Sequence, residues 1–248
     1  MANQVTISQI ELMRSENTNT GTSWTRNEQF DKDGYFIVKN IWDKNELFHS
    51  LPEGTGKIKY LDKSLENFEH DTSEGCVEGS LARYWHPKYR AIHSGVRLKL
   101  EKIIGRKLYN TYYYDRFYFP GLSLFKHTDR DACEISVSVH VSTNLTGENA
   151  KWPFYIKTPD TYTDEKKNVI SARGEVKSLS LEPGDGVLYK GCERPHWRDP
   201  MPTEYKKNKW YNWYKKEEEV KDLYYHQIFF HYVLADGQRV HCAGDSGK

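Results

Sequence analysis

Three side chains of this sequence have the types and the spacing to hold one metal ion: His127, Asp129 and His196. Residues two apart on a β-strand point to the same face of a sheet, so His127 and Asp129 can aim at one point. A neighbouring strand that carries His196 would add a second imidazole. Two imidazoles and one carboxylate on one side of an ion are typical of non-haem iron(II), with the other positions open for a cosubstrate and oxygen. Because structural sites close their coordination shell, three ligands with open positions predict a catalytic centre.

The segments that must position these ligands have the pattern of short β-strands separated by turns. Residues 108–119 are dense in Tyr and Phe, and Pro120-Gly121 marks a turn before residues 122–126. Residues 134–141 alternate strictly between apolar and polar side chains. The other expected strands are residues 152–157, 175–181, 187–190 and 224–234. This series predicts a β-sandwich or a jelly roll with its core at residues 106–234.

Around this core, the sequence predicts supporting segments of one domain at residues 25–248. Residues 1–24 are polar and rich in Asn, Thr and Ser, which is typical of a flexible lead-in. Apolar residues recur at helical spacing from 87 to 105, with a proline at the start and a glycine at the end. Residues 200–223 form a charged insertion too long for a hairpin turn, which fits either a mobile cover or a solvated surface segment.

Composition disfavours several kinds of partner. The formal net charge of +1 provides no bulk attraction for nucleic acid or for an anionic membrane. The basic run at residues 206–209 is followed by three glutamates, which favours a solvated face over a nucleic-acid site. We find neither an apolar run long enough to span a membrane nor the pattern of a secretory signal. Four scattered cysteines without a C-x-x-C pair favour reduced thiols and a cytoplasmic protein. The sequence does not specify an oligomeric state.

Several motifs resemble those of the 2-oxoglutarate- and Fe(II)-dependent oxygenases. Tyr118-Phe-Pro-Gly121, with His127-Thr-Asp129 following, is similar to the strand–turn–strand entrance of the prolyl-4-hydroxylase branch. Residues 30–38 resemble the opening of phytanoyl-CoA-dioxygenase-like members. Other stretches are similar to small oxygenases of bacteria and marine phages: Pro183-Gly-Asp-Gly, Tyr189-Lys-Gly-Cys-Glu and His196-Trp-Arg. The resemblance implies a mainly β fold with flanking helices, built on a double-stranded β-helix, which is a cupin-like jelly roll.

This resemblance also implies a reaction. His127, Asp129 and His196 would bind Fe(2+), and 2-oxoglutarate would chelate the iron beside O2. The enzyme would hydroxylate a C–H bond of a peptidyl or small-molecule substrate and release succinate and CO2. The entrance motif favours an amino-acid or prolyl side chain, a small metabolite follows closely, and demethylation of nucleic acid ranks lower. The competing interpretation is a non-catalytic cupin-like module that binds metal or another ligand without turnover.

A cation must bind the distal carboxylate of 2-oxoglutarate, and an arginine fork suits this role best. Arg198 is the first candidate because it lies two residues beyond the second histidine and shares its strand face. Many members of the family place this cation further along the chain, which here falls near Lys206 and Lys207. Arg130 and Arg116 are further candidates.

Aromatic residues near the ligands are candidates for contacts with cosubstrate and substrate. Tyr112, Tyr114 and Tyr118 alternate on one strand face, and a phenol hydroxyl from one of them would suit the cosubstrate carboxylate. Aromatic core packing is the alternative for each of them. Trp152 and Trp197 are candidates for the walls of a substrate mouth, although buried tryptophans are also ordinary core residues.

Overall fold

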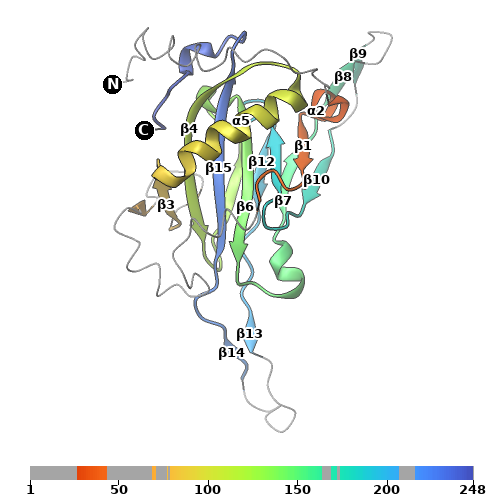
Figure 1. Ribbon diagram of the computed structural model, residues 1–248. Helices are drawn as coiled ribbons and strands as arrows, with labels where there is room; N and C mark the ends of the chain where they lie inside the picture. Colours follow the sequence, from red (N-terminus) through yellow and green to blue (C-terminus); the bar gives the residue numbers. More distant parts are fainter. Residues whose placement is uncertain are drawn as a thin grey trace.

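The protein, a computed structural model, has a body of two antiparallel β-sheets with one long helix against the larger sheet (Figure 1). The structure describes residues 27–43, 69–70, 77, 79–163, 169–171, 174–206 and 216–247. The lead-in predicted at residues 1–24 lies outside this part of the chain.

The described chain is mainly β. Its helical segments are α2 (Glu28–Asp33), η3 (Pro87–Tyr89), α5 (Arg90–Ile104), η4 (Asp131–Cys133), η5 (Gly147–Lys151) and η7 (Val240–Cys242). Its strands are β1 (Tyr35–Val38), β2 (Glu69–His70), β3 (Leu81–Tyr84), β4 (Leu108–Tyr118), β5 (Leu124–His127), β6 (Ile135–Thr143), β7 (Phe154–Lys157), β8 (Thr161–Thr163), β9 (Val169–Ser171), β10 (Val176–Leu179), β11 (Gly186–Tyr189), β12 (His196–Arg198), β13 (Tyr205–Lys206), β14 (Glu218–Glu219) and β15 (Tyr225–Leu234).

The chain passes repeatedly from one sheet to the other, which makes the fold a double-stranded β-helix. The larger sheet has the strand order β1-β11-β6-β15-β4-β3-β2, and the smaller one has the order β10-β7-β12-β5. Along the chain, β4, β5, β6 and β7 lie alternately in the larger and the smaller sheet. β10 follows in the smaller sheet, and β11, β12 and β15 then alternate again. The predicted jelly roll is confirmed. Each of these strands therefore presents one face to the space between the sheets.

Helix α5 covers the outer face of the larger sheet because its apolar residues recur on one side (Figure 1). It occupies the range in which the spacing predicts a helix, and Gly105 ends it with φ of 69°. The buried apolar positions of α5 are Ile92, Val96, Leu100 and Ile104. The alternating run in β6 packs in the same cluster through Ile135, Val137, Val139 and Val141.

The inner face of the larger sheet is polar and aromatic. Its buried inward residues include Tyr112, Arg116 and Tyr118 of β4, Ser136, Ser138 and His140 of β6, and Tyr225, Gln227, Phe229 and His231 of β15. A buried polar group costs free energy unless it is hydrogen-bonded, so this lining indicates a site inside the barrel.

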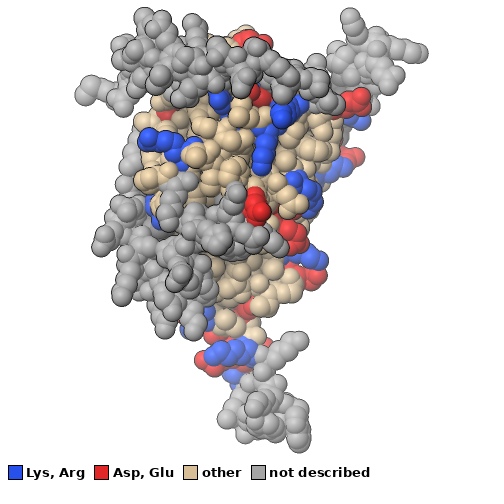
Figure 2. Space-filling model, in the orientation of Figure 1, with Lys and Arg blue, Asp and Glu red and all other residues tan. Residues whose placement is uncertain are grey.

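The insertion at residues 200–223 contains a narrow hairpin in which β13 pairs with β14. These two strands project away from the barrel (Figure 1). Residues 207–215 lie outside the described residues, so the predicted cover over the pocket stays a prediction. Side chains of both charges are interspersed on the face seen in Figure 2. In the part of the chain that the structure describes, no helix has the length and apolar character needed to cross a membrane.

Candidate active site

The three predicted metal ligands meet where β5 lies beside β12. His127 ends β5, His196 begins β12, and the two are partners across the antiparallel ladder. Asp129 Oδ1 lies 3.5 Å from His127 Nε2 and 3.4 Å from His196 Nε2. The three ligand atoms all lie within 4.8 Å of one another. Donors that each lie about 2.1 Å from one ion are at most about 4.2 Å apart, so the separations from Asp129 suit a single ion.

Backbone carbonyl groups orient both histidines. Nδ1 of His127 donates to the carbonyl of Phe125 at 2.7 Å, and Nδ1 of His196 donates to that of Arg194 at 2.9 Å. A carbonyl oxygen only accepts, so each Nδ1 must carry the proton. The other nitrogen of each ring, Nε2, is the atom that faces Asp129, and it is the nitrogen left to bind a metal in place of a proton. Both rings are therefore oriented as metal ligands, and the residues present fit an iron ion.

The carboxylate of Asp129 is held from behind by Ser136. Ser136 Oγ donates to Asp129 Oδ2 at 3.0 Å, while Oδ1 faces the two histidines. Burial alone would raise the pKa of Asp129, but the charges and hydrogen bonds of His196 and His127 hold it well below its usual range. The side chain is therefore an ionised carboxylate with one oxygen directed at the metal position.

Sequence reasoning missed the residues that support Asp129. His231 Nδ1 lies 2.9 Å from Ser136 Oγ, and burial lowers the pKa of His231 to about 4, so the ring is neutral. Gly191 packs so close that a Cβ there would meet Asp129 Oδ2 and, at 2.9 Å, Ser136 Oγ. One signal was present in the sequence: the serines of residues 134–141 lie opposite the apolar side chains and so face inward.

β12 also places Arg198 inside the barrel. Only 1% of Arg198 is exposed, and its Nη1 donates to the carbonyl of Trp152 at 2.5 Å. The guanidinium carbon lies 4.5 Å from the ring centroid of Trp152 and 4.9 Å from that of Tyr225. Its Nε and Nη2 are buried and have no hydrogen-bond partner among the described residues. A buried cation with unused donors is costly, so these donors indicate a place for an anion.

The three candidate tyrosines lie at different depths of the barrel. The ring of Tyr118 packs edge-on against Trp152, at 5.1 Å between centroids, beside Arg198. Tyr114 stacks on Phe229 at 4.7 Å. Tyr112 lies near the loop that follows Asp129, where its hydroxyl is 3.1 Å from the sulfur of Cys133 in η4. Of these three candidates, Tyr118 is thus the one that the structure brings close to Arg198, through their shared neighbour Trp152.

The other candidate cations have different positions. Arg130 forms an ion pair with Asp245 at 2.5 Å and lies over the ring of Tyr112. It therefore holds the C-terminal segment rather than pointing into the barrel. Lys206 pairs with Glu218 in the projecting hairpin, and Lys207 lies outside the described residues.

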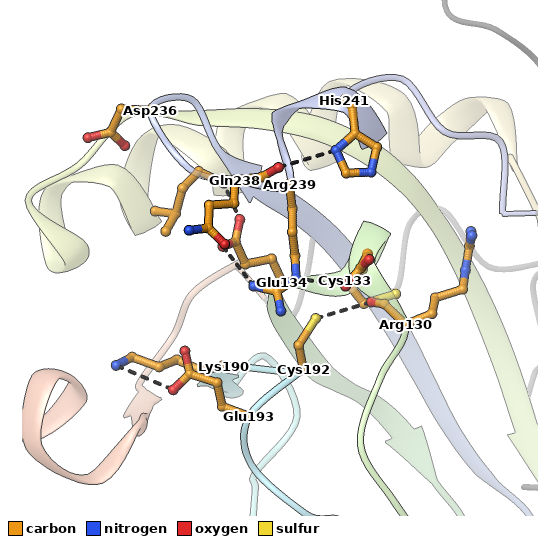
Figure 3. Close-up of polar contacts among 12 residues, drawn as sticks. Arg130, Cys133, Glu134, Lys190, Cys192, Glu193, Asp236, Gln238, Arg239 and His241 are labelled. Carbon is orange, nitrogen blue, oxygen red and sulfur yellow. Dashed lines mark hydrogen bonds and ion pairs between the residues drawn. The ribbon is translucent and has the colours of Figure 1, made fainter.

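The loop after Asp129 is tied to two other segments (Figure 3). Cys192 Sγ, from the turn before β12, contacts the carbonyl of Arg130 at 3.3 Å. Arg239, from the C-terminal segment, donates to Asp131 at 2.8 Å and to Glu134 at 3.4 Å. These contacts fix the loop that follows the predicted metal ligand Asp129.

The two candidate tryptophans lie on opposite faces of the smaller sheet. Trp152 is 3% exposed, and its Nε1 donates to the carbonyl of Asp199 at 3.0 Å. Trp197 alternates with the inward His196 and Arg198, so it points outward and stacks on Tyr155. The structure therefore brings Trp152, but not Trp197, into the barrel interior.

Comparisons with known proteins agree with this architecture. No family model matches the chain, and no curated protein matches it. A prolyl-4-hydroxylase from Pseudomonas putida superimposes with a TM-score of 0.54 at 13% identity, covering 82% of this chain and 95% of that one. A prolyl hydroxylase from Trichoplax adhaerens, solved with a peptide fragment of the hypoxia-inducible factor oxygen degradation domain, gives 0.53 at 12% identity, with 92% and 94% covered. The fold is that of the 2-oxoglutarate/Fe(II) oxygenases.

A third structure of this fold, an oxidoreductase of the 2OG-Fe(II) oxygenase family from Burkholderia pseudomallei, has a TM-score of 0.52 at 10% identity. It covers 91% of this chain and 98% of its own. The likeness at such identities concerns the fold, so the chemistry has to be argued from the side chains of this chain.

Proposed function

We propose that this chain is a non-haem Fe(II)- and 2-oxoglutarate-dependent dioxygenase that hydroxylates a C–H bond and releases succinate and CO2. One observation supports it above the others: His196, one of the three candidate ligands, and a buried arginine with unused donors share the inner face of the short strand β12. A module that only binds a metal has no need of such a cation. This favours the enzyme over the cupin-like binding module.

The spacing of His196 and Arg198 suits the cosubstrate. Residues two apart on a strand are separated by about 6.6 Å. A five-carbon diacid with four C–C bonds of about 1.5 Å spans a similar length. One carboxylate end would therefore lie at the metal position while the other end reaches the guanidinium of Arg198, which provides bidentate, charge-assisted hydrogen bonds.

The chain's own contribution is binding, orientation and exclusion of water. Bound iron would let O2 supply the oxygen atom and the oxidising power that convert C–H to C–OH, and 2-oxoglutarate would supply two electrons as it is converted to succinate and CO2. His127, Asp129 and His196 would occupy one side of the ion and leave the opposite side open. Trp152 and Tyr118 close the end of the barrel around Arg198, so its charge acts in a low-dielectric surrounding.

Succinate release tests the proposal directly. The purified protein is assayed with iron, ascorbate, oxygen and 2-oxoglutarate, beside the variants His127→Ala and Asp129→Ala. Both variants should lose turnover, because each removes one of three ligands. The exposed Arg106, which pairs with Asp236, gives a control in Arg106→Gln. Turnover equal to wild type in both ligand variants would refute the proposal.

Arg198→Gln tests the cosubstrate contact. Loss of one partner from a buried, charged hydrogen-bonded pair costs about 2–5 kcal/mol. The concentration of 2-oxoglutarate needed for half-maximal turnover should therefore rise about 30-fold or more, at about 1.4 kcal/mol per tenfold. An unchanged requirement would exclude Arg198 as the anchor.

For the substrate, an amino-acid or prolyl side chain and a small metabolite both fit the proposed class. The Trichoplax adhaerens enzyme was solved with a peptide, which supports testing peptides as well as free metabolites. We also propose a cytoplasmic location, which the free thiols of Cys133, Cys192 and Cys242 support. Cell fractionation tests it, and recovery outside the cytoplasm would contradict it.

A further inference from the structure

A thiol and a phenol lie in contact close to the proposed metal centre. The hydroxyl of Tyr112 on β4 is 3.1 Å from Sγ of Cys133 in η4, and both side chains are buried. We propose that the two become joined covalently, by a thioether bond between Cys133 Sγ and the ring carbon beside the Tyr112 hydroxyl. This inference rests on the proposed dioxygenase function, which provides the oxidant, and adds a self-modification to it.

The pair lies beside a predicted metal ligand. Cys133 Sγ, a carboxylate oxygen of Asp129 and a ring nitrogen of His231 all lie within 4.8 Å of one another. The ring centroid of Tyr112 lies 4.7 Å from that of His231. The sulfur and the phenol are therefore separated from the metal position by little more than one carboxylate group.

The observed contact already has the spacing of the product. Atoms bonded to two adjacent carbons of a planar ring lie about 3 Å apart, so the separation of oxygen and sulfur need not change when the bond forms. Packing holds the ring in place: the guanidinium carbon of Arg130 lies 4.9 Å from its centroid, and a Cβ at Gly247 would lie 2.5 Å from its Cδ2. Two groups fixed in contact react as one molecule, which favours bond formation between them.

Burial restricts what the thiol can react with. Cys133 is 3% exposed and Tyr112 is 6% exposed, so reagents in bulk water do not reach this sulfur, whereas the phenol touches it. Oxidation of a cysteine to its sulfenic acid depends on exposure and on thiolate character. The buried position therefore favours linkage to the neighbouring ring over that competing product.

The linkage is a two-electron oxidation. The S–H bond of Cys133 and one ring C–H bond of Tyr112 break and a C–S bond forms, while the phenol keeps its O–H. When no substrate is bound, two electrons from this pair and two from 2-oxoglutarate, which becomes succinate and CO2, reduce one molecule of O2. One oxygen atom ends in succinate, and the other ends in water together with the two hydrogen atoms of the pair.

The bond would join β4 to the segment that follows Asp129. Its two residues are 21 apart in sequence. A covalent link stabilises a fold mainly because it restricts the unfolded chain. The link would therefore stabilise the part of the chain that presents Asp129 to the metal.

Mass spectrometry tests the inference without relying on turnover of a substrate. The protein is expressed in iron-depleted medium, purified without oxygen, and then given Fe(II), 2-oxoglutarate and air. After reduction with dithiothreitol and digestion with trypsin, Tyr112 lies in peptide 108–116 and Cys133 in peptide 131–151. The two peptides should be found mainly joined, lighter than their sum by two hydrogen atoms, and fragmentation should place the bond at Tyr112 and Cys133.

Four variants show which groups the link requires. Tyr112→Phe and Cys133→Ser should give no linked peptide, and His127→Ala should give none because it removes a metal ligand. Cys192→Ser is the matched control, because this second thiol also contacts the loop after Asp129, at the carbonyl of Arg130. It should form the link to the same extent as wild type.

Several outcomes would overturn the inference. Succinate release without a linked peptide would do so and leave the dioxygenase proposal intact. A link that dithiothreitol breaks, a link to Tyr113 or Tyr114, or an oxygen atom added to Cys133 in place of the link would do the same. Equal linkage in His127→Ala would show that the metal centre is not needed. Absence of succinate release in wild type would refute the dioxygenase and, with it, this inference.

Discussion

Replacing Gly191 with alanine should damage the metal centre through a single added methyl group. The new Cβ would lie 2.9 Å from Ser136 Oγ and closer still to Asp129 Oδ2 and the carbonyl oxygen of Cys133. Two of these three neighbours cannot yield freely: one is backbone, and the other is the carboxylate that faces both histidines. The carboxylate must therefore move away from the metal position, or the turn that carries Gly191 must shift.

The size of the effect follows from these contacts. Overpacking a well-packed site costs typically about 1–3 kcal/mol of folding free energy. Disturbing groups that orient metal ligands typically lowers metal affinity about 10- to 100-fold. We therefore expect the affinity of Gly191→Ala for Mn(II), used as an unreactive substitute for Fe(II), to fall within that range. Calorimetric titration measures it, and thermal unfolding of the metal-free protein measures the folding cost separately.

Gly121→Ala is the matched control. Gly121 has φ of 84°, so alanine is strained there, but nothing lies within 4 Å of the added Cβ. This variant should lose about 1 kcal/mol of stability while keeping its metal affinity. The reasoning would be refuted if Gly191→Ala bound Mn(II) as tightly as wild type, or if Gly121→Ala lost as much affinity.

Two further predictions concern Ser136 and His93. Ser136→Ala removes the hydrogen bond to Asp129 Oδ2, so Mn(II) affinity should fall about tenfold. It also leaves His231 Nδ1 without this partner, so folding stability should fall by about 1–3 kcal/mol. An unchanged affinity would contradict the supporting role. Burial lowers the pKa of His93 to about 3, so between that pH and the unfolded value of about 6.5 the unfolded chain binds a proton that the folded chain does not. The contribution of His93 to folding stability is therefore complete above about pH 6.5 and declines on acidification. In denaturant titrations at pH 7, 6 and 5, the free energy of unfolding should decline less in His93→Phe than in wild type. An equal decline in both proteins would exclude His93 as its source.

The fold and the placing of His127 beside Asp129 were predictable because they depend on local pattern. The alternation in residues 134–141 assigns an outer apolar face and an inner serine face, and the structure has both. His127 and Asp129 are only two residues apart, so they lie close together in any conformation of the loop. Trp197 shows the limit of this reasoning. Its aromatic character alone suggested a substrate wall, whereas its place between two inward residues sends it outward.

By itself, the sequence determined the strand periodicity, the long amphipathic helix and the residue types that can bind iron, because these depend on neighbours along the chain. Only the tertiary structure decided which residues support the site. Gly191, Ser136 and His231 lie far apart in sequence and converge behind Asp129 through the pairing of β6 with β11 and β15. The pairing of β12 with β5 and β7, and of β4 with β15, gives Arg198 and Arg116 separate places in one barrel. A local pattern decides which face of a strand is buried. Which distant strand becomes its neighbour depends on the packing of the whole sheet.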